Sequence, residues 1–497
     1  MGARQKTGLV LGPALFALVM LLPRPDGMDP AMQRVAAVAL LMASWWICES
    51  IPLAATALLP VVLFPALGAM RPSAATAPYA NHLIFLFLGG FLIAVTMERW
   101  ELHRRIAVKT IRVVGRGPAR IILGFMIASS VLSMWISNTA TVMMMVPIGL
   151  AVIRHAESCV GGDGGRDAAR EDMTGRFSPA LMLGIAYGAS IGGAATLIGT
   201  PPNVILAGYI ERTWGVQVSF ASWMAFGVPL AVVMLVIAWL ILTRVAFRLR
   251  GSAFDAGMTC IEEEARSLGP LLPQEKRVLA VFVCVAAAWI GRGFIGPVRD
   301  RIADSTIAVA GALALFLLPS GRGNGERLLD WSTASRIPWE VIILFGGGLS
   351  LAGGFAQTGL DLWIGERLTV LGGVDQTVLI AAVVLLSFFL TEVTSNTATA
   401  AMMLPVIAGL ALSMSMHPFG PLIGSCIASS YAFMLPVATP PNAIVFGSRR
   451  VTMLQMIRAG AMLNLIGWIL IVITVTRLLP IVWGIDLSSV PHWATGG

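Results

Sequence analysis

Long apolar segments of about twenty residues recur along this chain of 497 residues and are separated by short polar stretches. A run of that length is what an α-helix needs to cross the hydrocarbon core of a bilayer. The strands of a β-barrel would show a weaker alternation of apolar and polar residues. The pattern therefore predicts an all-α integral membrane protein with about 11 transmembrane helices.

Two polar motifs interrupt the apolar pattern, and both occur twice. The sequence SNTATVMMMVP at 137–147 recurs as SNTATAAMMLP at 395–405, and Thr-Pro-Pro-Asn at 200–203 recurs at 439–442. Different motifs that recur in the same order indicate a duplicated unit. A pair of glycines at 89–90 recurs at 347–348, at the same distance along the chain as separates the two copies of the SNTAT motif. The repeat therefore extends beyond the polar motifs.

The duplication sets the expected organisation of the chain. We assign one amino-terminal span outside the repeat, a first unit, a cytoplasmic linker and a second unit, at 1–33, 34–250, 251–276 and 277–497. Each unit holds five spans, of which 51–68 is one in the first unit. An odd number of spans inserts the second copy with the opposite orientation, as in transporters with inverted-topology repeats.

The polar motifs predict two kinds of irregular membrane element. The two apolar segments on either side of Ser137 are each too short to cross the membrane. Arg120 and Arg154 flank the pair, so both ends lie on the same side of the membrane. We therefore expect re-entrant hairpins at 118–154 and 375–413. The double prolines predict broken spans at 178–212 and 418–447, because proline removes a helix donor and clashes with the preceding turn. Such breaks are tolerated at membrane depth only where they line a cavity or are covered by protein.

The motifs offer hydroxyl and amide groups, and none of them contains Lys or Arg. Neutral oxygens suit an alkali cation, whereas zinc or copper prefers His or Cys, and the five cysteines and five histidines have no metal-like spacing. The amino ends of broken helices attract anions. An anionic substrate would need co-bound cations to balance its charge, which would couple the two fluxes.

Composition and charge support a membrane location. Only 12% of residues are charged, against about 25% in soluble domains. The net charge of +8 does not indicate nucleic acid, because the basic residues lie between the spans. By the positive-inside rule they place the amino terminus in the cytoplasm and the carboxy terminus outside. The compact loops indicate a bacterial inner membrane. A basic amphipathic segment at 103–120 is expected at the cytoplasmic interface, although an ordinary basic loop is an alternative. The acidic run at 262–264 is expected to be solvated.

Several stretches resemble the divalent anion/sodium symporter family over nearly the whole chain. They are IPLA to LLP at 51–60, SMWISNTAT at 133–141, TEVTSNTAT at 391–399 and both TPPN motifs. The resemblance implies a homodimer, an inverted five-span repeat after the first span, and elevator-type alternating access. The implied sodium ligands are Ser133, Ser137, Asn138 and Gly199 at one site and Thr391, Thr394, Asn396 and Ala438 at the other. The implied substrate-binding residues are Ser137, Asn138, Thr139, Ser395, Asn396, Thr397, Thr200 and Thr439.

The function implied by the resemblance is sodium-driven uptake of a four-carbon dicarboxylate such as succinate, malate or fumarate. Sodium-independent exchange, or symport of sulfate or a tricarboxylate, is an alternative within the family. A channel is a further alternative, and a proton-carrying role for Glu392, beside the second tip, is also considered. An enzyme is not expected, because the serines of the motifs have no His or Lys partner there.

Overall fold

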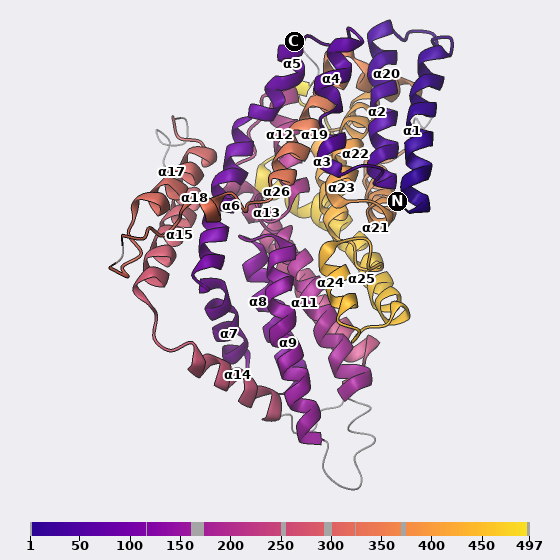
Figure 1. The fold of residues 1–497 in the computed structure, drawn as a ribbon. Helices are drawn as coiled ribbons and strands as arrows, with labels where there is room; N and C mark the ends of the chain where they lie inside the picture. The colour runs from indigo at the N-terminus through magenta and orange to yellow at the C-terminus, as the bar shows by residue number, and fades with distance from the viewer. Residues whose placement is uncertain are drawn as a thin grey trace.

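The computed structural model describes residues 2–115, 117–160, 173–249, 255–292, 301–323, 325–368 and 374–494. These residues form helices joined by turns and loops, with a single isolated β-bridge between Pro319 and Arg327. Among them, eight helical segments are long and apolar enough to cross a membrane, and four shorter apolar helices accompany them. Figure 1 shows the elongated bundle that these helices form.

The chain begins with two long helices that pack against each other, α1 (Ala3–Leu21) and α2 (Pro30–Cys48). The span expected at 51–68 is not one helix but two short ones, α3 (Leu53–Thr56) and α4 (Leu59–Ala66). Pro52 precedes α3 and Pro60 lies in the first turn of α4. Proline is tolerated at a helix start, but it disfavours helix in the residue before it. The apolar run is therefore divided at its prolines.

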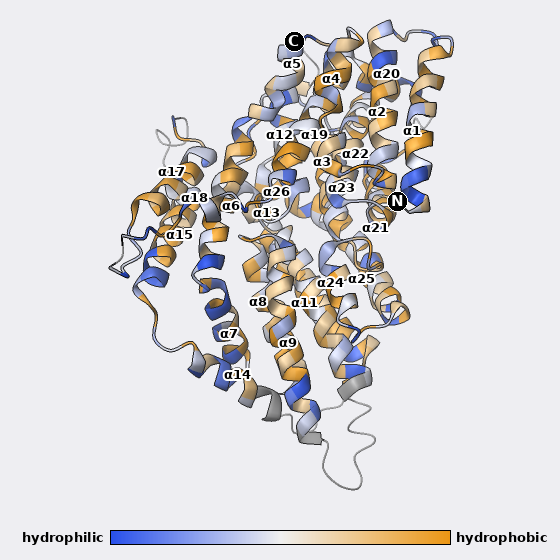
Figure 2. Ribbon diagram, viewed as in Figure 1, coloured by the Kyte–Doolittle hydropathy of each residue, from blue (hydrophilic) through white to orange (hydrophobic). Residues whose placement is uncertain are grey.

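The basic segment predicted at 103–120 forms α7 (Leu102–Val114), which follows α6 (His82–Arg99). Its apolar face is buried and packs on α8 (Pro118–Ser133). On its polar face, Arg104 donates to Glu264 of α14 (Asp255–Ser267) at 2.7 Å. Glu264 is therefore paired rather than simply solvated as expected. Figure 2 shows the hydrophilic residues gathered on α7 and α14.

The two SNT motifs lie at the turns of two helical hairpins. The first consists of α8 and α9 (Asn138–Val160), and the second of α21 (Gln376–Val393) and α22 (Asn396–Ser413). The double prolines begin the second halves of two interrupted helices. The first pair is α11 (Ser178–Gly193) and α12 (Pro201–Trp214), and the second is α23 (Phe419–Ser430) and α24 (Pro440–Gly447).

The hairpins and the interrupted helices of the two halves are interleaved. Helix α12 packs on α22 of the other hairpin, and α24 packs on α9 and α11 (Figure 1). Arg450, just after α24, forms an ion pair with Glu157 of α9. Glycines allow the closest contacts, since a Cβ added at Gly188 of α11 would lie only 2.7 Å from the Met126 carbonyl oxygen of α8. Small residues permit this kind of approach between membrane helices.

The remaining helices surround this interleaved group. They are α5 (Pro72–Thr76), η1 (Ala77–Ala80), η2 (Met173–Phe177), α13 (Phe220–Leu240), η3 (Ile241–Ala246), α15 (Pro273–Gly291), α17 (Asp304–Leu317), α18 (Trp331–Ala334), α19 (Trp339–Thr358), α20 (Leu360–Leu368), α25 (Met453–Ile473), η6 (Thr474–Leu478), α26 (Leu479–Trp483) and η7 (His492–Ala494). Helices α6 and α17 pack along each other, and α19 packs on α12 and α22.

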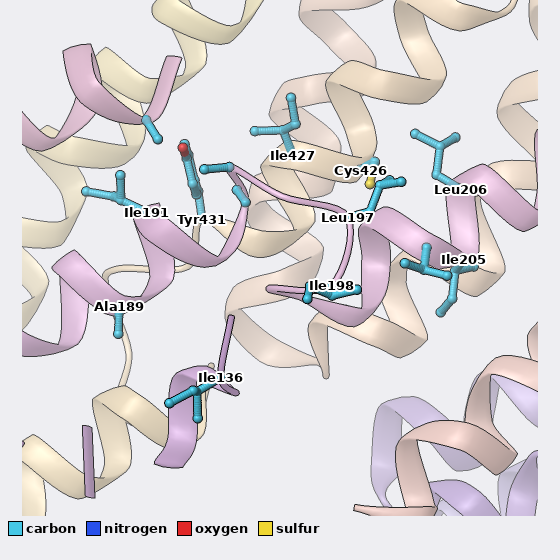
Figure 3. Close-up of a cluster of buried hydrophobic side chains, with 14 of the residues drawn as sticks. Ile136, Ala189, Ile191, Leu197, Ile198, Ile205, Leu206, Cys426, Ile427 and Tyr431 are labelled. Atoms are coloured by element: carbon cyan, nitrogen blue, oxygen red, sulfur yellow. The ribbon is translucent and has the colours of Figure 1, made fainter. Parts of the chain in front are cut away.

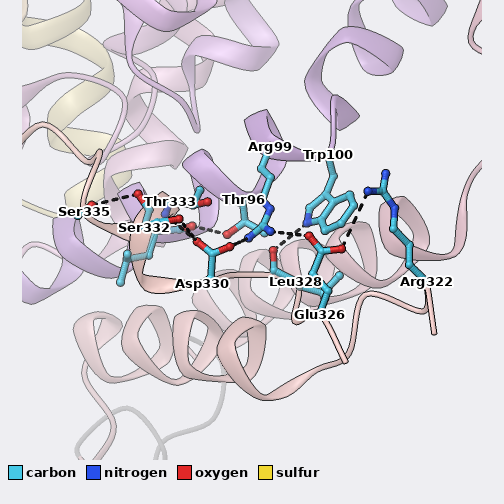
Figure 4. A network of polar contacts seen from close by, with 11 residues as sticks. Thr96, Arg99, Trp100, Arg322, Glu326, Leu328, Asp330, Ser332, Thr333 and Ser335 are labelled. Atoms are coloured by element: carbon cyan, nitrogen blue, oxygen red, sulfur yellow. Dashed lines mark hydrogen bonds and ion pairs between the residues drawn. The ribbon is translucent and has the colours of Figure 1, made fainter. Parts of the chain in front are cut away.

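A polar network fastens the end of α6 to the segment between α17 and α19 (Figure 4). Arg99 pairs with Glu326 at 2.7 Å and with Asp330 at 2.6 Å. The neighbouring Trp100 donates from Nε1 to the Leu328 carbonyl at 2.8 Å. Hydrogen bonds from Ser332 and from the backbone N–H of Thr333 hold the pKa of Asp330 well below its usual value. This carboxylate therefore stays ionised and keeps Arg99 in place.

Candidate transport site at the hairpin tips and helix breaks

The first hairpin tip lies against the first helix break. Ser133, the last residue of α8, donates from Oγ to Oδ1 of Asn138, the first residue of α9. A Cβ added at Gly199 would lie 2.8 Å from the Ser133 carbonyl oxygen, and one at Gly193 would lie 2.9 Å from Asn138 Nδ2. Glycine is required at 199, where the neighbouring atoms are backbone, whereas a Cβ at 193 would displace the Asn138 side chain. The fold thus brings together three of the residues expected to hold the first sodium ion, namely Ser133, Asn138 and Gly199.

The second tip repeats the first contact with equivalent residues. Thr391 Oγ1 lies 2.7 Å from Asn396 Oδ1 and 2.7 Å from the carbonyl oxygen of Ser429 in α23. Thr394 Oγ1 contacts Thr399 Oγ1 and donates to the Leu390 carbonyl at 2.8 Å. Ala438 is buried at the end of the second break. The two tips therefore share the hydroxyl–amide pair, although they differ in the groups around it.

The asparagines of the TPPN motifs donate hydrogen bonds to backbone carbonyls around the helix breaks. Asn203 donates from Nδ2 to the carbonyls of Ala194 and Thr196 at 3.2 and 2.7 Å. Asn442 donates likewise to Ala432 and Leu435 at 3.0 and 3.1 Å. These two asparagines were not among the expected site residues. Because an amide carries two donors, one side chain bonds two backbone carbonyls around each break. Two of these carbonyls have a second donor, since Ala194 also accepts from Trp223 Nε1 and Leu435 from the Ala438 N–H.

The expected substrate-binding residues differ in their burial. Half-buried positions are Ser137, Asn138, Thr139, Ser395 and Asn396, whereas Thr397, Thr200 and Thr439 are buried. Ser430 of α23 donates to Thr200 Oγ1 at 3.5 Å, which links the two halves of the chain. Within the described residues, no protein hydrogen bond engages the amide Nδ2 of Asn138 or Asn396. Both amide groups therefore remain available as donors.

Glu392 has a structural role that sequence reasoning did not assign. Its carboxylate accepts hydrogen bonds from the backbone N–H groups of Phe433, Met434 and Leu435 at 2.9, 2.9 and 3.0 Å. Asn464 of α25 donates to it at 2.7 Å. Four N–H donors on one carboxylate form strong charge-assisted bonds and favour an anchor over a carrier of protons. The available signal was a glutamate inside an apolar run beside the polar tip.

The first half has a different residue and a different contact at the position that corresponds to Glu392. Met134 stands where the second half has Glu392, and its backbone carbonyl accepts from Thr196 Oγ1 at 2.6 Å. Ile136 similarly stands where the second half has Thr394. As a result, the buried Thr141 Oγ1 has no partner among the described residues, whereas its equivalent Thr399 does. The two tips are therefore chemically similar but not identical.

Buried apolar side chains lie around the first break (Figure 3). The labelled residues come from the hairpin tip, the break and the two interrupted helices: Ile136, Ala189, Ile191, Leu197, Ile198, Ile205, Leu206, Cys426, Ile427 and Tyr431. A surrounding of low polarity strengthens electrostatic interactions between bound ions. The few polar groups at the tips are therefore placed where a cation and an anion would attract each other strongly.

Interrupted membrane helices packed around two polar tips define a membrane transporter of the secondary active class. In the described part of the chain, no group of His, Cys, Asp or Glu is arranged to hold a catalytic metal. The chain belongs to the family described as the sodium:sulfate symporter transmembrane region, whose family model matches residues 3–485. The family predicted from the motifs is thereby confirmed, as is the prediction of a transporter rather than an enzyme.

Relatives of this chain match it over almost its whole length. The sodium-dependent dicarboxylate transporter SdcS of Staphylococcus saprophyticus is 43% identical over 489 residues, which cover 98% of this chain and 93% of the relative. The protein of the same name from Staphylococcus aureus strain USA300 is 43% identical over 491 residues, covering 98% and 94%.

Solved structures of two more distant transporters share the fold. The YdaH transporter of Alcanivorax borkumensis aligns with a TM-score of 0.57 at 14% identity, over 92% of this chain and 98% of that one. MtrF of Neisseria gonorrhoeae aligns with a TM-score of 0.59 at 14% identity, over 95% of each chain. At this identity the likeness concerns the fold alone.

Proposed function

We propose that this protein couples sodium entry to the uptake of a divalent anion of the four-carbon dicarboxylate class, such as succinate, malate or fumarate. The observation that carries the proposal is the hydroxyl–amide pair made by Ser133 with Asn138 and again by Thr391 with Asn396. Two such pairs beside two helix breaks give two sites of neutral oxygens. The dicarboxylate class is supported by the two staphylococcal relatives, which are named for it.

The sodium ions would bind between each tip and its neighbouring break. The first site comprises Ser133, Ser137, Asn138 and Gly199, and the second Thr391, Thr394, Asn396 and Ala438. The close approach of Gly199 to the Ser133 carbonyl supports the first site. When sodium arrives, the hydroxyl proton that now points to Asn138 Oδ1 turns away, and both oxygens then face the ion. Oxygen ligands of this kind suit a hard alkali cation.

The substrate would bind to the donors that remain. Its carboxylates would meet the free amide groups of Asn138 and Asn396, supported by hydroxyls on both tips and at the breaks. These hydroxyls belong to Ser137, Thr139, Ser395, Thr397, Thr200 and Thr439. With no Lys or Arg in the motifs, sodium supplies the balancing charge. The anion site is then complete only after cations bind, which is a coupling free energy between the two ligands.

Transport would proceed by an elevator movement of the interleaved group that the two hairpins and the two interrupted helices form. The interleaved packing of α12 on α22 and α24 on α9 supports a group that moves as one body. His82 of α6 contacts Glu211 of α12 at 2.7 Å, across the boundary between this group and the surrounding helices. That contact must break as the group moves. We place a homodimer in the bacterial inner membrane, with the amino terminus in the cytoplasm and the carboxy terminus outside.

Uptake of labelled succinate into proteoliposomes tests the proposal. An inward sodium gradient should drive accumulation, and an equal potassium gradient should not. Sulfate and citrate, added as competitors, report whether the site prefers another divalent or a trivalent anion. Uptake that needs only internal dicarboxylate, and no sodium, would show an exchanger instead.

A further inference from the structure

A cavity of about 750 Å³ lies away from the hairpin tips, where η2, η3 and α25 meet. Four arginines line it: Arg176, Arg244, Arg248 and Arg458. Gln455 donates from Nε2 to the Gly175 carbonyl at 3.5 Å and joins η2 to α25 across the cavity. The site is therefore a strongly basic pocket built from three separate segments of the chain.

Among the described residues, three of these arginines have no acidic partner. Arg244, Arg248 and Arg458 are exposed, and no carboxylate of the described residues lies within 4 Å of their charged groups. The arginines of α7 differ, since Arg104 pairs with Glu264 and Arg105 with Glu275. Arginines that served only to orient the protein by the positive-inside rule would not need to line the same pocket. Several unpaired guanidinium groups around one cavity repel each other and favour an anion between them.

Two exposed apolar ridges lead to this pocket. On α13, Val232, Val236 and Leu240 follow one another at four-residue spacing, and Arg244 continues the series. On α25, the ridge consists of Leu465, Ile469 and Ile473, and it continues through Met462 to Arg458. The six aliphatic side chains of the ridges are between 39% and 57% exposed. Residues spaced by three or four lie on one face of a helix, and α13 packs beside α25.

We propose that this pocket binds the phosphate of an anionic phospholipid headgroup, whose acyl chains lie along the ridges of α13 and α25. Guanidinium groups bind phosphate oxygens in paired hydrogen bonds, and basic pockets between membrane helices bind lipid headgroups. A free phosphate would use the arginines but would leave the ridges uncovered. The ridges therefore favour a lipid over a soluble anion.

The pocket is connected to the proposed transport site through α25. Two residues beyond Arg458, Gly460 packs so closely on the second break that a Cβ there would lie 2.6 Å from Met434 Cα. One turn further, Asn464 donates to Glu392, the residue that holds the same break. A lipid bound at Arg458 therefore stabilises the helix on which the second break depends.

Binding of phosphatidylglycerol to the purified full-length protein tests this inference. In detergent, added phosphatidylglycerol should raise the melting temperature, and phosphatidylcholine should not. Replacing all three unpaired arginines (R244Q, R248Q and R458Q together) should weaken the response to phosphatidylglycerol about a hundredfold in lipid concentration. R477Q is the matched control, because Arg477 is an exposed arginine that lies at the other end of the same helical segment, outside the pocket.

Each result bears on the proposal directly. Should the triple variant be too unstable to purify, R458Q alone should still lower the response about fivefold. The inference is overturned if the arginine variants respond to phosphatidylglycerol like the wild type. It is equally overturned if inorganic phosphate at the same concentration reproduces the whole thermal shift. The readout is lipid binding, so its outcome does not depend on whether the transported substrate has been assigned correctly.

Discussion

The asparagines of the two repeated motifs have different roles in this protein. Asn203 and Asn442 turn both donors toward backbone carbonyls of the breaks, which is a structural use. Asn138 and Asn396 engage only Oδ1 with other described residues, within the hairpins, and keep their donors available. The same residue type is thus structural in one motif and suited to ligand binding in the other.

This difference predicts separable effects of substitution. Asn138→Ala and Asn396→Ala should each lower sodium-driven uptake by about a hundredfold or more, since each removes a shared ligand of cation and anion, while the melting temperature stays near that of the wild type. Asn203→Ala should instead lower the free energy of unfolding by about 2 kcal/mol, because two buried carbonyls lose a donor. Uptake and thermal melting measured on the same preparations check both statements. Normal uptake by either of the first two variants would refute the site assignment.

Glu392 allows a second test at this scale. Glu392→Gln replaces an oxygen acceptor by an N–H₂ donor facing backbone N–H groups, and should cost about 2–4 kcal/mol of stability. Uptake should fall by a similar factor at every pH between 5.5 and 8.5. A proton carrier would behave differently, because its loss would change the shape of the pH profile.

The helices of this fold differ in how well the neighbouring sequence predicts their boundaries. The double prolines stand at the starts of α12 and α24, because a helix interior cannot accommodate them. The short helices α3 and α4 were expected as one span, because their apolar run concealed the effect of Pro52 and Pro60. The contacts of Glu392 were not predictable, since its partners at 433–435 contribute backbone N–H groups that any residue carries.

The corner between α22 and α23 should respond to pH. His417 is buried there beside Phe419 and Trp493, and accepts a hydrogen bond from the Phe419 N–H at 3.2 Å. Burial lowers the pKa of His417 to about 4, although the nearby Asp486 acts in the opposite direction. The neutral ring therefore stabilises the fold fully above about pH 6.5, and this contribution is lost as the pH falls toward 4.

The expected loss at low pH is at most about 3 kcal/mol. It should appear as a steeper fall of the melting temperature between pH 6.5 and 4 in the wild type than in His417→Gln, which has no group to protonate. Comparing the two proteins removes the contribution of the carboxylates common to both. Parallel curves would show that His417 is not held in its neutral form.

At the scale of the whole molecule, the duplicated motifs predicted that the two halves share one site, but the particular helices by which the halves pack were not predictable. The surfaces by which α12 contacts α22 and α24 contacts α9 consist largely of ordinary apolar side chains, which mark burial but not a partner. The polar exceptions are local, such as Ser430 with Thr200. The duplicated motifs indicated two related units, whereas their interleaving required the structure.

The proposed elevator movement predicts the effect of a short cross-link between α6 and α12. In a background without the native cysteines, cysteines introduced at His82 and Glu211 should react with a short bifunctional thiol reagent, because the native side chains are in contact. Cross-linked protein should lose at least about nine-tenths of its uptake, since the moving group is tied to its surroundings. Full activity after complete cross-linking would exclude relative movement at this boundary. Each single-cysteine protein treated with the same reagent is the control.

The interleaved packing also has a consequence for biosynthesis. Helix α9 emerges from the ribosome early, but its partner α24 begins at Pro440, close to the end of translation. The first hairpin must therefore wait in the lipid, with the face of α9 that receives α24 uncovered, until α24 has been made. Quality-control proteases and membrane insertases would encounter that exposed intermediate, so truncated products ending before α24 should be degraded rapidly in the cell.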